Sequence, residues 1–327
     1  IGDKKIGVGH PCFIIAEIGN NHNGSLINAF KLIDEAKKAG ADCVKFQMRD
    51  MKNLYSNRGK ILDEKEDLGS QYTLDLLNKF QLSKKDMFKA FDYCKKRNII
   101  PLCTPWDISS VEKLEKYNLK GYKTASADLS NYDLLKTVSK TGKPMICSTG
   151  MSKEVEIIDT VQHLKSIGAK YSLLHCNSTY PAPFKDLNIN YINSLRKIGQ
   201  CPVGYSSHDR GINIVIASVA LGANIIEKHF TLDTKMEGND HRVSIETQDF
   251  TLMVKGIRQV EESLGKTNGR SLSQGEMINR ENLGKSLVSA TSLKKGTILK
   301  PQHIKVLSPG QGLSPLLYDS LLGRKLK

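Results

Sequence analysis

Residues 202–231 have the sequence PVGYSSHDRGINIVIASVALGANIIEKHFT, and this stretch contains the unit from which the fold is built. A short apolar run ends at Ser207, apolar residues three and four apart cover Ile212–Leu221, and a second apolar run begins at Ile225. Two strand-like runs separated by an amphipathic helix predict a βαβ unit with parallel strands.

The same alternation continues in both directions from this unit. It gives strand-like runs at FIIAE (13–17), CVKFQ (43–47), IIPLCT (99–104), GYKTAS (121–126), PMICST (144–149), YSLLHCNS (171–178), PVGYSS (202–207) and IIEKHFT (225–231). Eight βα units in roughly 250 residues predict a (β/α)8 barrel, the TIM barrel, whose active sites lie at the carboxyl ends of the strands. We therefore predict an α/β barrel over residues 1–264.

The composition changes after Leu264. Residues 265–282, GKTNGRSLSQGEMINREN, are polar and rich in Gly and Asn, which predicts a linker over 265–284. Residues 285–327 carry short apolar pieces separated by turn sequences such as Lys294-Lys295-Gly296. This pattern predicts a second domain too small to be stable without packing against another surface.

The bulk composition excludes several classes of protein. The 327 residues are 39% hydrophobic and 25% charged, and no apolar run approaches the roughly 20 residues of a membrane span. The first residues lack a signal-peptide pattern, so we expect a cytoplasmic protein. Forty-eight basic and 34 acidic residues give a charge of +14, but the lysines occur as dispersed pairs without the aromatic residues of nucleic-acid modules. The seven cysteines form no CxxC pair and suit reduced, buried thiols.

Nearly every predicted strand ends in a reactive polar side chain. In chain order these are Glu17, Lys45, Gln47, Thr104, Lys123, Ser126, Ser148, Thr149, Asn177, Ser178, Ser206, His208, Lys228 and His229. Taken singly, a lysine or serine at such a position is more often a solvated charge or a turn residue. Lysines and hydroxyls that converge from several strands can bind the oxygens of a phosphate or carboxylate, so we predict a pocket for an anionic substrate.

Two histidines follow neighbouring predicted strands. His208 comes after the seventh and His229 ends the eighth, so both imidazoles should reach the same side of the barrel mouth. A single histidine at such a place is more often a packed one. A pair beside the Glu17 carboxylate instead favours a divalent first-row metal with open coordination positions.

The connection from Met48 to Leu82 is unusually long, which is typical of functional loops. Lys52, Arg58 and Lys60 could bind a second phosphate there. The same segment also contains Asp63, Glu64, Glu66 and Asp67, and this mixture favours a solvated loop.

Several motifs together resemble the sialic-acid synthase family. They are HPCFIIAEIGNNHNG (10–24), ADCVKFQ (41–47), CTPWD (103–107), KTASAD (123–128), ICSTGM (146–151), LLHCNSTYPAP (173–183), GYSSHDRG (204–211), IIEKHFTLD (225–233) and GNDHRVS (238–244). They occur in the family's order over nearly the whole chain. Residues 283–304 are similar to the family's small C-terminal SAF domain, an antifreeze-like fold of the β-clip type.

The resemblance implies a metal-dependent condensation, typically with Mn²⁺, in which C3 of phosphoenolpyruvate attacks the C1 aldehyde of an open-chain acylamino-mannose and phosphate leaves. By motif position, His208 and His229 would hold the metal. Phosphoenolpyruvate would be bound by Lys45, Thr104, Lys123, Ser126, Ser148, Ser178 and Ser206. The sugar would be bound by Glu17, Gln47, Tyr180 and Asp240. The residues implied as catalytic are Glu17, which could also handle protons, Lys123 and the two histidines. The resemblance further implies a homodimer in which each C-terminal domain reaches the partner's barrel.

Two departures from the family pattern affect what can be transferred. Lys123–Asp128 replaces a KxGSGE motif, so two glycines are lost and the carboxylate is one methylene shorter. Ser308-Pro309-Gly310 replaces an Arg-Pro-Gly that contacts the sugar, and Lys305 or Arg324 would have to take the arginine's place.

Several alternative functions stay open. The sugar could be N-acetylmannosamine, its 6-phosphate, or a diacetamido-trideoxyhexose that leads to legionaminic or pseudaminic acid. Other readings are a different phosphoenolpyruvate-dependent barrel enzyme, an aldolase that forms a Schiff base with free pyruvate, and a non-catalytic carbohydrate-binding protein.

Overall fold

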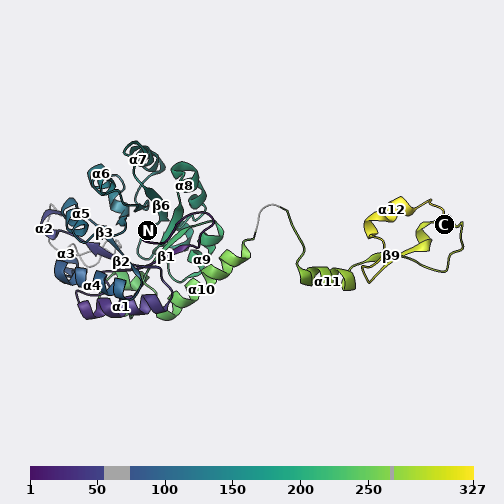
Figure 1. Ribbon diagram of the computed structural model, residues 1–327, viewed down its shortest axis with the longest axis horizontal. Helices are drawn as coiled ribbons and strands as arrows, with labels where there is room; N and C mark the ends of the chain where they lie inside the picture. Colours follow the sequence, from purple (N-terminus) through teal and green to yellow (C-terminus); the bar gives the residue numbers. More distant parts are fainter. Residues whose placement is uncertain (55–73, 266–268) are drawn as a thin grey trace. The chain divides into compact units, whose positions relative to one another are not determined.

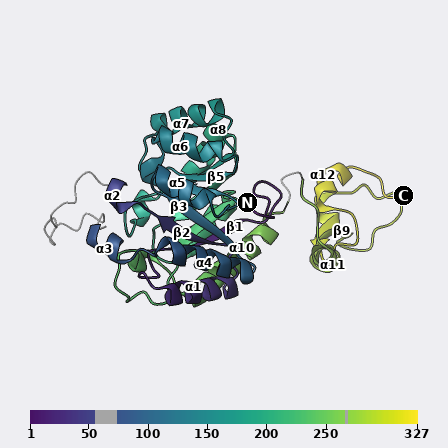
Figure 2. The same ribbon diagram turned by 60° about the vertical axis from the view of Figure 1, so that its left-hand side comes forward.

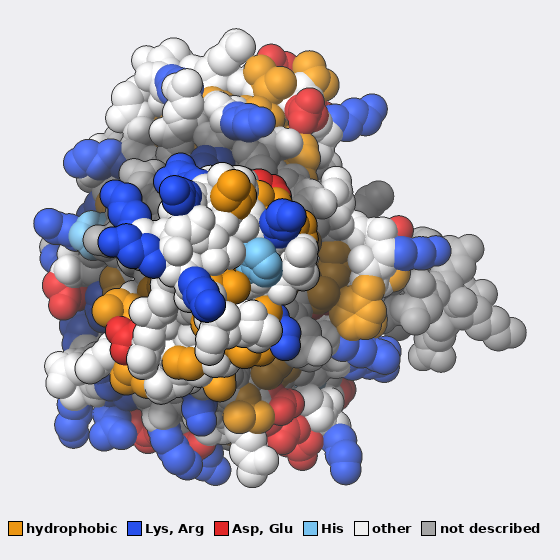
Figure 3. Space-filling view, turned by 90° about the vertical axis from the view of Figure 1, so that its right-hand side faces the viewer, with side chains coloured by type: hydrophobic (Ala, Val, Ile, Leu, Met, Phe, Trp, Pro, Cys, Tyr) orange, Lys and Arg blue, Asp and Glu red, His pale blue; other side chains and the backbone are white. Residues whose placement is uncertain are grey.

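The computed structural model describes residues 1–54, 74–265 and 269–327, and the chain forms two compact units, Ile1–Gly265 and Lys266–Lys327. No helix in the described part of the chain is both long and apolar enough to cross a membrane. On the face drawn in Figure 3, the Lys and Arg side chains are scattered among acidic and apolar ones.

The first unit contains the predicted barrel. Its parallel strands are β1 (Phe13–Gly19), β2 (Cys43–Met48), β3 (Ile100–Pro105), β4 (Tyr122–Thr124), β5 (Met145–Ser148), β6 (Tyr171–Cys176), β7 (Val203–Ser207) and β8 (Ile225–His229). They are ordered β3-β2-β1-β8-β7-β6-β5-β4, and β3 and β4 lie side by side where the ring closes. The eight-stranded barrel predicted from the sequence is confirmed.

The helices surround this ring of strands (Figures 1 and 2). They are α1 (Leu26–Lys38), α2 (Met51–Leu54), α3 (Leu74–Lys79), α4 (Lys84–Lys96), α5 (Ile108–Glu115), α6 (Tyr132–Lys140), α7 (Glu154–Ser166), α8 (Tyr191–Gly199), α9 (Asn213–Ala220) and α10 (Thr247–Ser263). Short 3-10 turns follow three strands at η1 (Ser126–Asp128), η2 (Phe184–Asp186) and η3 (Asp240–Val243). Side chains cap several helix starts, as where Asp107 accepts a 2.7 Å bond from the Ser110 amide at α5.

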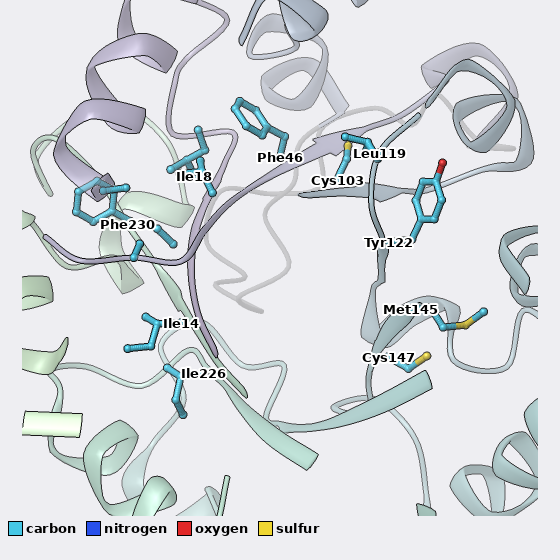
Figure 4. Packing of buried hydrophobic residues seen from close by; sticks show 14 of the residues in the cluster. Ile14, Ile18, Phe46, Cys103, Leu119, Tyr122, Met145, Cys147, Ile226 and Phe230 are labelled. Carbon is cyan, nitrogen blue, oxygen red and sulfur yellow. The ribbon is translucent and has the colours of Figure 1, made fainter. Parts of the chain in front are cut away.

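Alternate residues of each strand face opposite sides of the ring. The outward set, which includes Ile14, Phe46, Tyr122, Cys147 and Ile226, packs between the strands and the helices (Figure 4). A second cluster packs separately from the outer one and contains residues at alternate positions: Phe13, Ile15, Cys43, Leu102, Ile146, Leu174 and Ile225. These residues form the apolar interior of the barrel, and two positions further along the strands the same side becomes polar.

The second unit is small. It contains α11 (Gln274–Leu283), the antiparallel pair β9 (Ser286–Ser289) and β10 (Ile304–Leu307), the 3-10 turns η4 (Pro301–His303) and η5 (Pro315–Leu317), and α12 (Tyr318–Leu321). Helix α11 lies within the segment that composition predicted as linker. It forms because Ser273 and Glu276 cap each other's backbone amides, over 3.3 and 2.8 Å. The assignment of this unit to the antifreeze-like fold stays a prediction.

Candidate active site

A cavity of about 390 Å³ is lined by residues at the carboxyl ends of the barrel strands. Of the residues that the resemblance assigns to the metal, phosphoenolpyruvate or the sugar, every one except Asp240 lines it. The lining residues are Glu17, Lys45, Gln47, Arg49, Leu77, Thr104, Trp106, Lys123, Ala125, Ser126, Ala127, Ser148, Met151, Cys176, Ser178, Tyr180, Ser206, His208, Glu227 and His229.

Side chains two residues apart on a strand point to the same face, and this explains why these side chains meet. Ile15 lies in the apolar interior cluster, and two residues later Glu17 lines the cavity. The same step leads from Leu102 to Thr104, and from Ile225 to Glu227. Side chains two apart on a strand share a face, so the polar residues form a layer above the apolar one.

A buried ion cluster occupies one side of the cavity. Lys45 Nζ lies 2.6 Å from Glu17 Oε2 and 3.8 Å from Glu227 Oε1, and it donates to Thr104 Oγ1 over 3.1 Å. Burial lowers the pKa of Lys45, but the two carboxylates outweigh burial and the pKa rises. Burial raises the pKa of Glu17 although Lys45 opposes this. Lys45 therefore stays a cation inside the barrel.

Lys123 is a second buried cation with different partners. Its Nζ donates to Ser148 Oγ over 2.6 Å and to the Thr124 carbonyl over 2.8 Å. Among the described residues no carboxylate lies within ion-pair distance of it. Burial lowers its pKa, with Glu227 opposing the shift. An anionic ligand oxygen would supply the missing counter-charge.

The two imidazoles lie close together, with ring centroids 5.3 Å apart, and Tyr180 stacks on His208 at 4.1 Å. His208 Nδ1 contacts the Asn177 carbonyl at 2.6 Å, which leaves Nε2 as its ligand nitrogen. Burial first, and then His208 and Lys45, hold the pKa of His229 well below 6.5, so His229 is neutral.

The donor set suits a divalent metal. His229 Nδ1 is buried without a hydrogen-bond partner among the described residues, and it lies 3.9 Å from Asp240 Oδ2. Imidazoles with nearby carboxylates are common ligands of first-row metals. Within residues 1–54, 74–265 and 269–327, no group of three or more His, Cys, Asp or Glu has a metal-binding arrangement. The two histidines would supply two of the ligands of such a metal.

Asp240 lies beside the cavity although it does not line it. It lines a small adjoining hollow with Asn20, Asn21 and Leu77, and Leu77 also lines the main cavity. A methyl group added at Gly19 would lie 2.5 Å from Glu17 Oε1, 2.8 Å from Gln47 Nε2 and 3.3 Å from Asp240 Oδ2. Three of the four residues that the resemblance assigns to the sugar, Glu17, Gln47 and Asp240, therefore converge on Gly19.

Replacing Gly19 with alanine should therefore disrupt this convergence. The added Cβ would push apart the 2.7 Å bond from Gln47 Nε2 to Glu17 Oε1, and misplacing such groups costs roughly 10²-fold in turnover. Steady-state kinetics and thermal unfolding would measure the effect. Gly168→Ala is the matched control, because Gly168 also has a positive φ but has no atom within 4 Å of an added Cβ. Equal losses of turnover in the two variants would mean that backbone strain alone is responsible.

The structure corrects the predicted orientation of Lys228. Its side chain lies outside the cavity, fully buried, and Nζ donates to Ser207 Oγ over 2.9 Å and to the Asp209 carbonyl. Burial lowers its pKa to about 8. Two other strand-end residues also lie outside the cavity lining: Thr149 Oγ1 donates to the Leu174 carbonyl, and Asn177 Nδ2 to the Asp186 carbonyl.

Four polar or aromatic lining residues were missed by sequence reasoning: Arg49, Trp106, Cys176 and Glu227. Glu227 could have been predicted from the two-residue repeat of side-chain direction in a strand, because it lies on the same face as His229. Cys176 follows in the same way from Leu174. Arg49 and Trp106 lie just beyond their strands, where the period no longer applies.

The two alanines that replace the motif glycines lie at the cavity. Ala125 and Ala127 line the cavity where the family motif has glycines, and Ser126 between them accepts a 3.1 Å bond from the Gly150 amide. Arg58 and Lys60, considered for a second phosphate, lie outside the described residues.

The fold and the cavity together define a barrel enzyme whose site suits an anionic substrate. The chain belongs to the NeuB family, whose model matches residues 32–269.

Two relatives and one solved structure show this similarity over nearly the full length. The N,N'-diacetyllegionaminic acid synthase of Campylobacter jejuni is 40% identical over 316 residues, which cover 95% of this chain and 94% of that protein. Human N-acetylneuraminate-9-phosphate synthase is 34% identical over 327 residues, covering 99% and 90%. The structure of N-acetylneuraminic acid synthetase from Leptospira borgpetersenii superposes with a TM-score of 0.77 at 32% identity, covering 86% of this chain and 95% of that one.

Proposed function

We propose that the protein is a synthase that condenses phosphoenolpyruvate with N-acetylmannosamine or a related 2-acylamino hexose, giving a nonulosonic acid and phosphate. The observation that carries the proposal is the pair of buried lysines. Lys123 lacks a carboxylate partner among the described residues, while Lys45 is held between two carboxylates in the same cavity. One cation is thus available for an incoming anion, and the other is coupled to groups that could handle a proton.

Phosphoenolpyruvate would lie on the lysine side of the cavity. Its phosphate and carboxylate oxygens would accept bonds from the two lysines and from the surrounding hydroxyls, those of Thr104, Ser126, Ser148, Ser178 and Ser206. When C3 bonds to the aldehyde carbon, positive charge develops at C2, water adds there, and the C–O bond to phosphate then breaks. The lysines would stabilise the departing phosphate.

The sugar would lie next to phosphoenolpyruvate, near Glu17, Gln47, Tyr180 and Asp240. Glu17 forms an ion pair with Lys45 and accepts from Gln47, so its position is fixed by two groups. A carboxyl group whose pKa is raised by burial is suited to give or take a proton near neutral pH. We assign proton handling at the new hydroxyl group to Glu17.

A divalent metal, in our proposal Mn²⁺, would be held by His208 and His229. When bound, it would polarise the aldehyde oxygen of the sugar. The lowered pKa of His229 supports this assignment, as does its Nδ1, which has no hydrogen-bond partner among the described residues.

The particular sugar and the assembly are also proposals. The names of the relatives include legionaminic acid and N-acetylneuraminate-9-phosphate synthases, so diacetamido-trideoxyhexoses, including the precursor of pseudaminic acid, and the 6-phosphate are the alternatives. We further propose a cytoplasmic homodimer in which the second unit, the predicted SAF domain, completes the partner's site.

Phosphate release from phosphoenolpyruvate, measured with N-acetylmannosamine, its 6-phosphate and a diacetamido-trideoxymannose, tests the reaction and the substrate together. Release with one sugar supports the proposal. Sugar-dependent consumption of free pyruvate without phosphate would instead indicate the aldolase, and borohydride would then trap a Schiff base on a lysine.

Removing the metal should strongly reduce phosphate release. The reason is that the aldehyde oxygen would lose its only divalent cation. The measurement is the rate after exhaustive chelation and after adding back Mn²⁺, Mg²⁺ or Zn²⁺ singly. Full activity in excess chelator would show that the two histidines act without a metal.

A further inference from the structure

Two residues in the cavity wall have no role in the scheme above. Arg49 follows β2 and Trp106 follows β3, and both line the cavity. The Arg49 guanidinium carbon lies 4.2 Å from the centre of the Trp106 rings. Arg49 is only 6% exposed, so the cation is stacked on the indole in a largely desolvated place.

Two hydrogen bonds connect the loops that carry these residues. The Trp106 amide donates to the Met48 carbonyl over 3.0 Å, which continues the β2–β3 pairing by one bond. Asp107 Oδ2 accepts from the Asp50 amide over 2.7 Å, while the same carboxylate caps α5. The guanidinium is therefore held over the indole by backbone connections on both sides.

Both side chains donate to the same oxygen. Trp106 Nε1 donates to Gln47 Oε1 over 3.2 Å, and Arg49 Nη2 donates to that oxygen as well. Neither an indole nor a guanidinium can accept a hydrogen bond. The Gln47 amide can therefore take only one orientation, and its Nε2 must face Glu17, to which it donates over 2.7 Å.

The charge of Arg49 adds to this effect. A cationic donor on the amide oxygen polarises the amide and makes its N–H a stronger donor at the other end. Among the described residues no carboxylate lies within ion-pair distance of Arg49, so Gln47 is its main partner. The chain of contacts runs from Arg49 and Trp106 through Gln47 to Glu17.

We propose that Arg49 and Trp106 are positioning residues that fix the Gln47 amide and, through it, the Glu17 carboxylate for the acceptor sugar. The inference rests on the proposed function for its kinetic readout. It predicts a larger effect on use of the sugar than on the binding of phosphoenolpyruvate, because the chain of contacts reaches Lys45 only through its ion pair with Glu17.

The test compares Arg49→Met and Trp106→Phe in the wild type and in a Gln47→Met background. Trp106→Phe keeps a ring under the guanidinium but removes the N–H. In the wild type each change should lower kcat/KM for the sugar about 10-fold, the usual scale for one lost hydrogen bond, with a smaller change in KM for phosphoenolpyruvate. In the Gln47→Met background each should add less than about 2-fold, because the shared acceptor is gone. A full 10-fold effect in that background would overturn the proposal and indicate direct contact with the sugar.

Fluorescence supplies a readout that does not need turnover, because Trp106 is the only tryptophan in the chain. Gln47→Met removes the acceptor of the indole N–H and should shift the Trp106 emission, whereas an unchanged spectrum would overturn the proposed contact. Arg97→Met is the control, since Arg97 pairs with Asp34 at a half-exposed position and should leave both spectrum and kinetics unchanged. Absence of wild-type turnover with every sugar would count against the proposed function, while the spectral result would still decide the Gln47 contact.

Discussion

Replacing Lys45 with methionine should lower kcat/KM for phosphoenolpyruvate by about 10³-fold or more, on the scale seen when a charge-stabilising group is removed from an active site. Lys45 is 4% exposed and, among the described residues, is the only group within ion-pair distance of both Glu17 and Glu227. Methionine keeps most of the length of the side chain and removes the cation. Steady-state kinetics with phosphoenolpyruvate as the varied substrate measures the loss.

The same change should destabilise the fold, and the loss should depend on pH. Burial already raises the pKa of Glu17 above 4.5, and Lys45 is the main group that lowers it. Without Lys45 the folded-state pKa of Glu17 rises further above its unfolded value. The folded state then holds a proton that the unfolded state releases, so stability is retained below about pH 4.5 and lost as pH rises through the folded-state pKa.

We therefore expect the deficit in unfolding free energy to be small near about pH 5 and to reach about 3 kcal/mol near about pH 8, the usual scale for breaking a buried ion pair. Urea unfolding at both pH values measures it. Lys45→Met/Glu17→Gln should recover much of the stability at high pH but none of the activity. Lys38→Met, which removes an exposed lysine paired with Glu35, should change neither. A deficit in Lys45→Met that shrinks as pH rises would contradict this account.

The sequence predicted the barrel and most of the cavity because one physical rule governs both. Alternating apolar runs and helices specify the βα units. A polar residue near the end of a strand then lines the cavity when the residue two positions before it packs in the apolar interior of the barrel. Lys45, Thr104 and Ser148 obey this rule and were predicted.

The same rule, applied residue by residue, would have separated Lys228 from Glu227. The prediction that Lys228 and His229 both face the cavity at the end of the eighth strand is wrong for Lys228, because neighbours on a strand face opposite sides. Ile225 lies in the interior cluster, so Glu227 and His229 share its face and Lys228 points to the outer layer.

Residues beyond the strand ends could not be placed in this way. Arg49 is positioned by the hydrogen bond between the Asp50 amide and Asp107, which connects two loops, and Asp240 approaches Gly19 from η3. Both positions result from contacts between segments far apart in the chain, which periodicity does not encode. The resemblance to a known family placed Asp240 but gave no role to Arg49 or Trp106.

Glu227, the carboxylate that the sequence analysis missed, leads to the second large effect. Its Oε1 accepts from Ser206 over 3.0 Å, and Oε2 has no hydrogen-bond partner among the described residues. Burial would raise its pKa, but Lys123 and Lys45 outweigh burial and the pKa falls. Glu227 is therefore an ionised carboxylate that offsets the charge of the lysines around the phosphoenolpyruvate position.

Glu227→Gln should lower kcat about 10³-fold and should also lower KM for phosphoenolpyruvate. Glutamine keeps the size of the side chain and can still accept from Ser206, but the lysines lose a counter-charge. They should then bind the anionic substrate and the phosphate product more tightly, so the ground state is stabilised more than the transition state. The measurements are kcat, KM and the inhibition constant of phosphate, all three of which should fall.

A matched control separates this effect from a change in net charge. Glu115→Gln removes the same charge from a half-buried carboxylate that pairs with Lys143 over 2.7 Å and does not line the cavity, so its kinetic constants should be unchanged. A rise in KM for phosphoenolpyruvate in Glu227→Gln, with kcat preserved, would contradict the argument, because it would mean that the carboxylate binds the substrate directly. A simultaneous fall in kcat and KM has no such explanation, since lost contacts weaken binding. It would identify Glu227 as the group that keeps the two lysines from holding their anions too strongly for turnover.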